Sequence, residues 1–254
     1  MPVMPGAEAY HHAGGQIGVL LCHGFTGSPQ SLRPWGEYLA AAGITVSLPR
    51  LPGHGTTWQE MSHTRWEDWY AELDKSLADL RGDCAEVFVM GLSLGGCMAL
   101  RLAEVHGDRI SGLVIVNPSV TNDVPLLRLA PLLRFVVASV PGVAGDIKKE
   151  GATELGYPRT PVKAAATLPR LWALTQSELS KITQPVLVFH SPQDHVVKPA
   201  SVRILREKLT GGNLNVVELA DSYHVATLDN DADQIFAGSL EFIKTNASVP
   251  LQRD

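Results

Sequence analysis

The chain has 254 residues, of which 45% are hydrophobic, and a formal net charge of −5. A chain of this length can bury a complete core, and a single α/β domain of this size is ordinary. The charged residues are spread along the sequence without a basic block or an acidic tail, so we expect a small-molecule partner and no nucleic acid.

The first nine residues contain no Lys or Arg and no apolar run of signal-peptide length, which predicts a cytoplasmic protein. The three cysteines, Cys22, Cys84 and Cys97, are too few and too irregularly spaced for a disulfide framework or a zinc site. We therefore expect buried free thiols and no metal site.

Apolar runs typical of strands alternate with helical patterns along most of the chain. The expected strands are 17–22, 44–48, 87–90, 113–116, 186–190 and 214–219. The expected helices are 31–42, 66–80, 96–105, 201–209 and 233–245. This alternation predicts an α/β fold with a mainly parallel sheet and helices on both of its faces.

Residues 117–184 interrupt the alternation, because they contain no convincing core strand and carry seven prolines. We interpret them as an inserted cap between two parts of the core, residues 1–116 and 185–254. Apolar residues follow a helical spacing in the first part of this segment: Leu126, Leu129, Leu133, Val136 or Val137, and Val140. This expected helix packs on the core, lines a pocket for an acyl chain, or does both, and it is too short and too charged to span a membrane.

Ser93 lies between Gly91 and Gly95, at the corner where an expected strand meets an expected helix. So tight a corner strains the serine backbone, and glycine at the flanking positions lets the strand and the helix pass closely. The hydroxyl is then exposed at a helix N-terminus, where amides and the helix dipole favour developing negative charge. The pattern predicts that Ser93 is a nucleophile.

A serine nucleophile needs a base beside it and an acidic residue that orients the base. In folds with such a serine corner, the three residues follow along the chain in the order nucleophile, acid, histidine, and each lies on a loop at the carboxyl end of a strand. Asp194 follows the expected strand 186–190, and His224 follows the expected strand 214–219. We predict Asp194 as the acid and His224 as the base, because an imidazole with a pKa of about 6.5 exchanges protons near neutral pH.

Other histidines and carboxylates fit these roles less well. His195 adjoins the predicted acid, and neighbouring turn residues seldom point at the same partner. The remaining candidates lie near the terminus, in or beside helical stretches, or away from any strand end: His11, His12, His63, His106, Asp221, Asp229 and Asp231.

Two backbone amides are predicted to bind the oxyanion of a tetrahedral intermediate, and loss of one such donor typically costs about 100- to 1000-fold in rate. Leu94 directly follows the nucleophile, and Phe25 lies in the loop after the expected strand 17–22. We interpret His23 and His54, in the loops after the first two expected strands, as structural hydrogen-bonding residues.

The motifs together resemble the α/β-hydrolase superfamily over almost the whole chain. They are His23-Gly24-Phe25, Pro52-Gly53-His54-Gly55, the glycine-rich corner at Ser93, Ser191-Pro192-Gln193-Asp194 and Ser222-Tyr223-His224. Within that superfamily the chain is most similar to small bacterial carboxylesterases and monoacylglycerol lipases with a short cap, through 145–148, 154–157 and 160–161. The resemblance implies Ser93 as nucleophile, Asp194 as acid, His224 as base, and the amides of Phe25 and Leu94 as the oxyanion hole.

The resemblance also suggests that Glu154 holds the glycerol hydroxyls of a monoacylglycerol, although a simply solvated glutamate is the alternative. The expected function is a serine hydrolase that cleaves carboxylic esters of medium to long acyl chains, foremost monoacylglycerol, through an acyl-enzyme and without a cofactor. A thioesterase, a lysophospholipase or an acyltransferase could use the same triad, and a ligand-binding protein could keep the fold without catalysis. Acyl-chain preference, oligomeric state and transient contact of the cap with a membrane surface stay open at this point.

Overall fold

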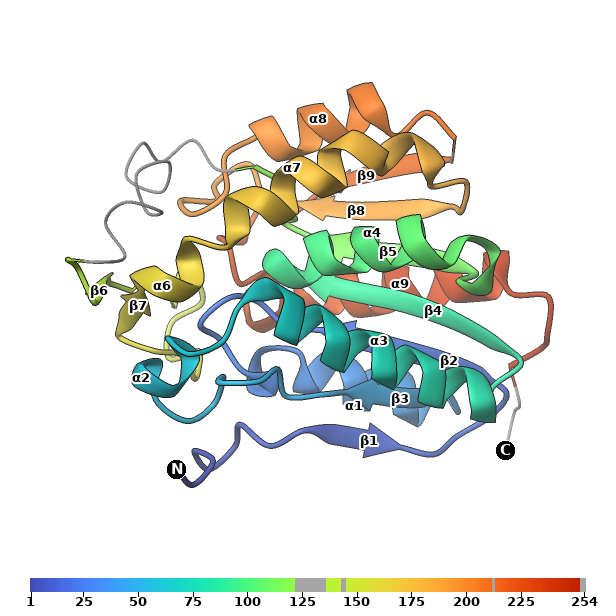
Figure 1. The fold of residues 1–254 in the computed structure, drawn as a ribbon. Helices are drawn as coiled ribbons and strands as arrows, with labels where there is room; N and C mark the ends of the chain where they lie inside the picture. Colours follow the sequence, from blue (N-terminus) through green and yellow to red (C-terminus); the bar gives the residue numbers. More distant parts are fainter. Residues whose placement is uncertain (122–135, 143–144, 212, 252–254) are drawn as a thin grey trace.

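The computed structural model describes residues 1–121, 136–142, 145–211 and 213–251. Its centre is a seven-stranded sheet in the order β1-β3-β2-β4-β5-β8-β9 (Figure 1). The strands are β1 (Tyr10–His12), β2 (Ile17–Cys22), β3 (Thr45–Leu48), β4 (Glu86–Leu92), β5 (Gly112–Val116), β8 (Val186–His190) and β9 (Leu214–Glu218). All neighbouring strands are parallel except β1 and β3. The predicted mainly parallel α/β sheet is confirmed.

Helices cover both faces of the sheet (Figure 1). One face carries α1 (Arg33–Ala41) and α9 (Ala232–Asn246), and the other carries α3 (Trp66–Asp83), α4 (Leu94–His106), α7 (Leu168–Glu178) and α8 (Ala200–Lys208). The short helices are η1 (Pro29–Ser31), α2 (Trp58–Met61), η2 (Gly107–Arg109), α6 (Val162–Ala165), η3 (Leu179–Lys181) and η4 (Ala226–Leu228). Within the described ranges, no helix is long and apolar enough to cross a membrane.

The core has two halves, one on each face of the sheet, because successive strand residues point to opposite sides. In β4, Val87 and Val89 pack with the α3 and α4 side, whereas Phe88 and Met90 pack with the α1 and α9 side. Both sets of side chains are almost inaccessible to solvent. Burial on both faces explains why the central strands β2, β4, β5 and β8 appear in the sequence as largely continuous apolar runs.

The chain leaves the sheet after β5 and returns at β8, although β5 and β8 are neighbours. We call the connecting residues 117–184 the cap segment. They include β6 (Ser139–Pro141) and β7 (Arg159–Pro161), which form a separate antiparallel pair near the end of the sheet where the parallel strands terminate (Figure 1). The division into a core and an inserted cap stays a prediction.

The helix expected in the first part of the cap segment is wrong over its described end, because Val136 lies in a turn, Val137 lies in no helix or strand, and Val140 lies in β6. Pro141 follows Val140, and a proline disfavours helical geometry in the residue before it. Leu126, Leu129 and Leu133 lie outside the described residues. Conversely, α7 was not expected in this proline-rich segment, but its Pro169 occupies the first turn, where a missing N–H costs nothing.

All three cysteines are free, with Cys22 and Cys97 buried and Cys84 partly exposed. In the described part of the chain, no group of three or more His, Cys, Asp or Glu side chains is placed to hold a metal ion.

Candidate active site

Ser93 occupies a strained corner between β4 and α4, with φ of 57° and ψ of −117°. A Cβ atom at Gly95 would lie 1.8 Å from the carbonyl oxygen of Cys22, and a Cβ atom at Gly91 would lie 2.4 Å from the Gly95 carbonyl group. Side chains at these two positions would push the strand and the helix apart. The glycine pattern around Ser93 is therefore a steric requirement of the corner.

Backbone hydrogen bonds hold the Ser93 conformation from three sides. Its N–H donates to the Val116 carbonyl at 2.9 Å, while its own carbonyl accepts from Ser119 at 3.0 Å and from Cys97 at 3.2 Å. A positive φ in a residue other than glycine persists where surrounding contacts enforce it, and such strain concentrates at functional sites. These bonds place Ser93 at the carboxyl end of β4, at the N-terminus of α4.

Asp194 and His224 meet at the same end of the sheet as Ser93, beyond the carboxyl ends of β8 and β9. Nδ1 of His224 lies 2.7 Å from Oδ2 of Asp194. The Asp194 side chain is only 2% exposed and the His224 side chain 8%. The other carboxylate oxygen of Asp194 accepts the N–H groups of Val196 and Val197, both at 2.7 Å. The two predicted partners of a serine nucleophile are thus in direct contact.

The pKa of the His224 imidazole is raised above its ordinary value. Burial alone would lower the pKa, but the hydrogen bond and the charge of Asp194, together with the charges of Glu154 and Asp146, outweigh it. Because Asp194 accepts a hydrogen bond from Nδ1, the neutral ring carries its proton there. Nε2 is then the nitrogen that can accept a proton.

The two predicted oxyanion donors lie in the loop after β2 and at the first residue of α4. No described residue accepts a hydrogen bond from the N–H of Phe25 or of Leu94. The Phe25 ring packs against Trp69 at 5.6 Å between centroids. The next residue, Thr26, has a φ of 62°, and its carbonyl accepts the N–H of Tyr157 at 3.1 Å. The cap segment therefore supports the loop that carries Phe25.

His23 and His54 are buried behind this loop and serve as hydrogen-bonding supports. Nδ1 of His23 lies 3.0 Å from the Gly24 carbonyl, and Nε2 accepts the N–H of Leu51 at 3.2 Å. Burial lowers the pKa of His23 to about 4, so its ring is neutral near pH 7. Nδ1 of His54 lies 3.1 Å from the Pro52 carbonyl, and burial lowers its pKa too. These contacts fit the structural interpretation of both histidines.

Glu154 lies close enough to His224 for the two side chains to shift each other's pKa. Its Oε2 accepts the N–H of Gly145 at 2.8 Å. Burial raises the pKa of the carboxyl group, while the Gly145 bond and the charge of His224 lower it in part. Oε1 lies 2.7 Å from where a Cβ atom at Gly27 would be, and no described residue donates a hydrogen bond to it. Oε1 of Glu154 thus has no hydrogen-bond partner among the described residues.

Gln30 fixes the backbone on both sides of Glu154. Its Nε2 donates to the Thr153 carbonyl at 3.0 Å, and its Oε1 accepts the N–H of Leu155 at 2.9 Å. Two hydrogen bonds from one planar amide define both the position and the orientation of the segment. Gln30 was not singled out in the sequence, because a glutamine in a polar loop carries no distinguishing pattern.

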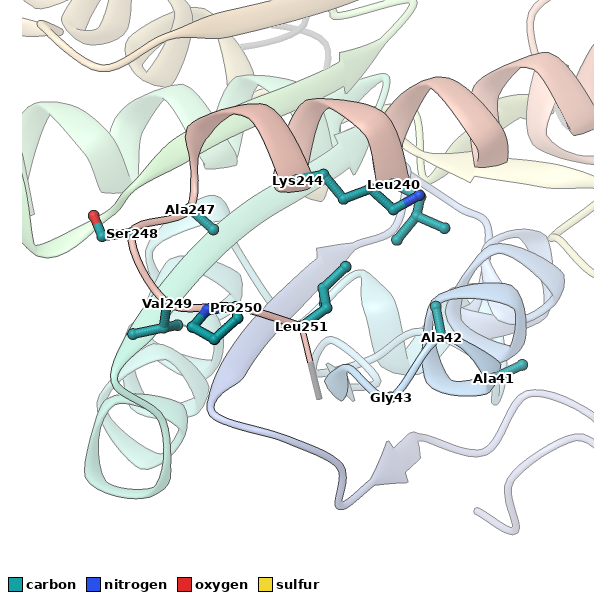
Figure 2. A pocket seen from close by; sticks show the side chains of 10 residues that line it. All are labelled: Ala41, Ala42, Gly43, Leu240, Lys244, Ala247, Ser248, Val249, Pro250 and Leu251. Atoms are coloured by element: carbon teal, nitrogen blue, oxygen red, sulfur yellow. The ribbon is translucent and has the colours of Figure 1, made fainter. Parts of the chain in front are cut away.

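A cavity lies between the end of α1, the end of α9 and the C-terminal residues (Figure 2). It has a volume of about 820 Å³ and is lined by the end of α1, by α9 and by the C-terminal residues: Ala41, Ala42, Gly43, Leu240, Lys244, Ala247, Ser248, Val249, Pro250 and Leu251. Ser248 and Val249 donate their N–H groups to Glu86, which begins β4, whereas Ser93 follows the end of β4. This cavity is therefore separate from the candidate active site.

The comparison with known protein families agrees with this geometry. A family model described as the alpha/beta hydrolase family matches residues 19–237, which include Phe25, Ser93, Asp194 and His224. The chain belongs to the alpha/beta hydrolase family. The predicted resemblance to the α/β-hydrolase superfamily is confirmed.

Two curated relatives of this alpha/beta hydrolase match it over nearly their full length. It is 41% identical over 251 residues to a thermostable monoacylglycerol lipase of Bacillus sp. (strain H-257), with 97% of this chain and 98% of that protein covered. It is 28% identical over 239 residues to a carboxylesterase of Bacillus subtilis (strain 168), with 91% and 94% covered. Both relatives are carboxylic ester hydrolases by name.

Solved structures show the same fold. A structure from work on LipS and LipT, two metagenome-derived lipolytic enzymes, superposes with a TM-score of 0.93 at 40% identity and covers 96% of this chain and 100% of that chain. A monoacylglycerol lipase from Paleococcus ferrophilus superposes with a TM-score of 0.78 at 22% identity, covering 94% and 100%. The second likeness shows the shared fold alone.

Asn117 is a residue of this alpha/beta hydrolase that sequence reasoning missed. It follows β5, has a φ of 43°, and donates its side-chain amide to Ser191 Oγ at 3.0 Å and to the His224 carbonyl at 2.9 Å. Its Oδ1 accepts the N–H of Ser191 at 2.8 Å. Asn117 thereby ties the loop that carries Asp194 to the loop that carries His224. Its position directly after a strand was the one signal that could have identified it.

Proposed function

We propose that this chain is a serine hydrolase that cleaves carboxylic esters, with monoacylglycerols as substrates, through an acyl-enzyme on Ser93. The observation that carries the proposal is the buried 2.7 Å contact between Asp194 and His224 at the sheet edge where Ser93 occupies its strained corner. The 41% identity to a monoacylglycerol lipase over nearly the whole chain supports the substrate.

In the first half of the reaction, Oγ of Ser93 attacks the ester carbonyl carbon while Nε2 of His224 accepts the hydroxyl proton. The carbonyl oxygen becomes an oxyanion that accepts hydrogen bonds from the N–H groups of Phe25 and Leu94. The C–O bond to the alcohol then breaks, and His224 donates its proton to the departing oxygen. The acyl group remains on Ser93 as an ester.

In the second half, a water molecule replaces the alcohol. His224 accepts a proton from the water as the oxygen attacks the acyl carbon, and the oxyanion forms again at the same two amides. The bond to Ser93 Oγ breaks, Oγ regains a proton from His224, and a carboxylic acid leaves. Asp194 keeps its hydrogen bond to Nδ1 throughout and stabilises the imidazolium that forms twice in each cycle.

We infer that Glu154 binds the glycerol part of the substrate. Oε1 of Glu154 has no donor among the described residues and can therefore accept a hydrogen bond from a glycerol hydroxyl, and the charge of Glu154 acts on His224, which donates a proton to the departing alcohol oxygen. A cytoplasmic location and transient contact of the cap with a membrane surface stay predictions.

The test is a chain-length series of 1-monoacylglycerols and p-nitrophenyl esters, with matched acyl thioesters beside them. We expect the highest kcat/KM for a monoacylglycerol of medium to long chain. Faster turnover of every thioester than of its matched ester would replace the proposal with a thioesterase. In a second arm, Glu154→Gln should raise KM for monoacylglycerol more than for the p-nitrophenyl ester, and an equal effect on both would contradict the glycerol role.

A further inference from the structure

A short stretch of the cap segment, residues 145–149, contacts both loops that carry the acid and the base. We call this stretch the brace. Oδ2 of Asp146 accepts the N–H of His224 at 3.1 Å and the N–H of His195 at 3.2 Å, and Oδ1 lies 2.8 Å from Nδ1 of His195. The carbonyl of Asp146 accepts the N–H of Val225 at 3.0 Å. Asp146 thus forms hydrogen bonds both with His195, which is next to Asp194 in the sequence, and with His224.

Asp229 anchors the other end of the brace. Its Oδ2 accepts the N–H groups of Lys148 and Tyr223, and its Oδ1 accepts those of Lys149 and Asn230, all at 2.8 Å. The residue is only 1% exposed. A buried carboxylate is costly unless hydrogen bonds compensate it, and here four backbone donors do so. Two of them come from the brace and one from the loop that carries the base.

We propose that Asp146 and Asp229 are positioning residues for the reaction. Through them the brace holds the loop of Asp194 and the loop of His224 in the relative position that the reaction needs. This inference rests on the proposed serine-hydrolase function. Neither carboxylate exchanges a proton with the substrate in the mechanism above. Asp146 acts through the backbone of His224, and Asp229 acts by holding the brace against the same loop.

Asp146 also contributes to the electrostatics of the base. The charged groups that face His224 are Asp194 from the loop after β8, and Glu154 and Asp146 from the cap segment, and each raises its pKa against the opposing effect of burial. Lys148 is turned to the surface, where its Nζ pairs with Asp221 at 2.8 Å. Removing the charge of Asp146 should therefore lower the pKa of His224.

The experiment compares Asp146→Ala, Asp146→Asn and Asp229→Ala with Asp221→Ala. The alanine variants at 146 and 229 should lower kcat by about ten- to a hundredfold, because misplacement of a catalytic group by about 1 Å has effects of this size. KM should change less than about twofold for both a short p-nitrophenyl ester and a monoacylglycerol. Asp221 is a matched control, because its side chain is 60% exposed and contacts only the Lys148 ammonium group of the brace.

The Asp146→Asn variant separates positioning from charge. Its amide oxygen can still accept the two backbone N–H groups, so kcat at the pH optimum should stay within about threefold of wild type. The acid limb of its kcat/KM profile should move to lower pH, because the lost charge no longer favours protonation of His224.

An NMR titration of the His224 ring in the same variants does not depend on turnover. A lower His224 pKa in Asp146→Asn, with the kcat losses above, would support the brace. An unchanged His224 titration together with wild-type kcat in Asp146→Ala would overturn it. A wild-type enzyme that hydrolyses no ester would instead overturn the proposed function, so the two failures are distinguishable.

Discussion

Asp194 presents one carboxylate oxygen to His224 at 2.7 Å and the other to two backbone N–H groups of its own turn. The carboxylate therefore has no freedom to rotate away from the imidazole. Since Nδ1 of His224 donates to Asp194, the orientation and the tautomer of the His224 imidazole are set by the turn after β8.

Replacing Asp194 with Asn should lower kcat by about 10³- to 10⁴-fold with little change in KM. The amide has one acceptor oxygen, so it cannot serve both His224 and the backbone N–H groups, and the imidazole loses the tautomer that it needs. The pKa of His224 is raised, so kcat/KM should fall as the pH falls through that raised value in the wild type. A pH profile measures this, and an acid limb at the same pH in Asp194→Asn would contradict the account.

Replacing Gly95 with Ala should destabilise the protein by about 3 kcal/mol, because the new Cβ atom would collide with the Cys22 carbonyl group. Gly82 in α3 is a matched control, since a Cβ atom there meets nothing within 4 Å. Gly82→Ala should stabilise by about 0.5 kcal/mol through helix propensity. Urea unfolding of both variants provides the measurement, and equal stability of the two would disprove the steric role of Gly95.

The buried neutral His23 should make the protein less stable in mild acid. Its pKa is about 4 in the folded chain against an ordinary value of 6.5, so between these values the unfolded chain binds a proton that the folded chain does not. The free energy of unfolding should therefore fall as the pH falls, with about 2 kcal/mol from His23 between pH 7 and pH 5. In His23→Asn the difference between urea unfolding at these two pH values should shrink by that amount, and an undiminished difference would contradict the assignment.

Gln30 should affect substrate choice through Glu154. Loss of its two hydrogen bonds in Gln30→Ala should raise KM for monoacylglycerol by about fivefold, equivalent to about 1 kcal/mol, and leave KM for a p-nitrophenyl ester within about twofold. In a Glu154→Gln background, Gln30→Ala should have little further effect on KM, because Glu154→Gln already weakens the glycerol contact that Gln30 supports. Fully additive effects would show that Gln30 acts independently of Glu154.

The sequence predicted the sheet well because its central strands are buried on both faces. The expected strands coincide with β2, β3, β4, β5, β8 and β9 to within two residues at each end. The corner at Ser93 was equally predictable from the sequence, since steric limits require glycine at positions 91 and 95 and the two glycines therefore appear as a motif. β1 was missed because Tyr10–His12 is short, polar and placed at the edge.

The supports of the site were much harder to predict. Asp229 follows no strand end, so its sequence position gives no sign of a role in the site, yet it accepts hydrogen bonds from the N–H groups of residues about 80 positions earlier. Asp146 and Gln30 likewise bind main-chain groups far away in the sequence, and such contacts require no particular partner residue type. A contact with backbone leaves no pattern in the partner sequence, so only the folded chain shows it.

Covalent labelling of the protein with a fluorophosphonate, followed by peptide mass spectrometry, tests directly whether Ser93 is the nucleophile. We expect one modified residue, Ser93, with labelling lost in Ser93→Ala and strongly slowed in His224→Ala while circular dichroism shows that both variants remain folded. Undiminished labelling or p-nitrophenyl ester hydrolysis in folded Ser93→Ala would show that Ser93 is not the nucleophile.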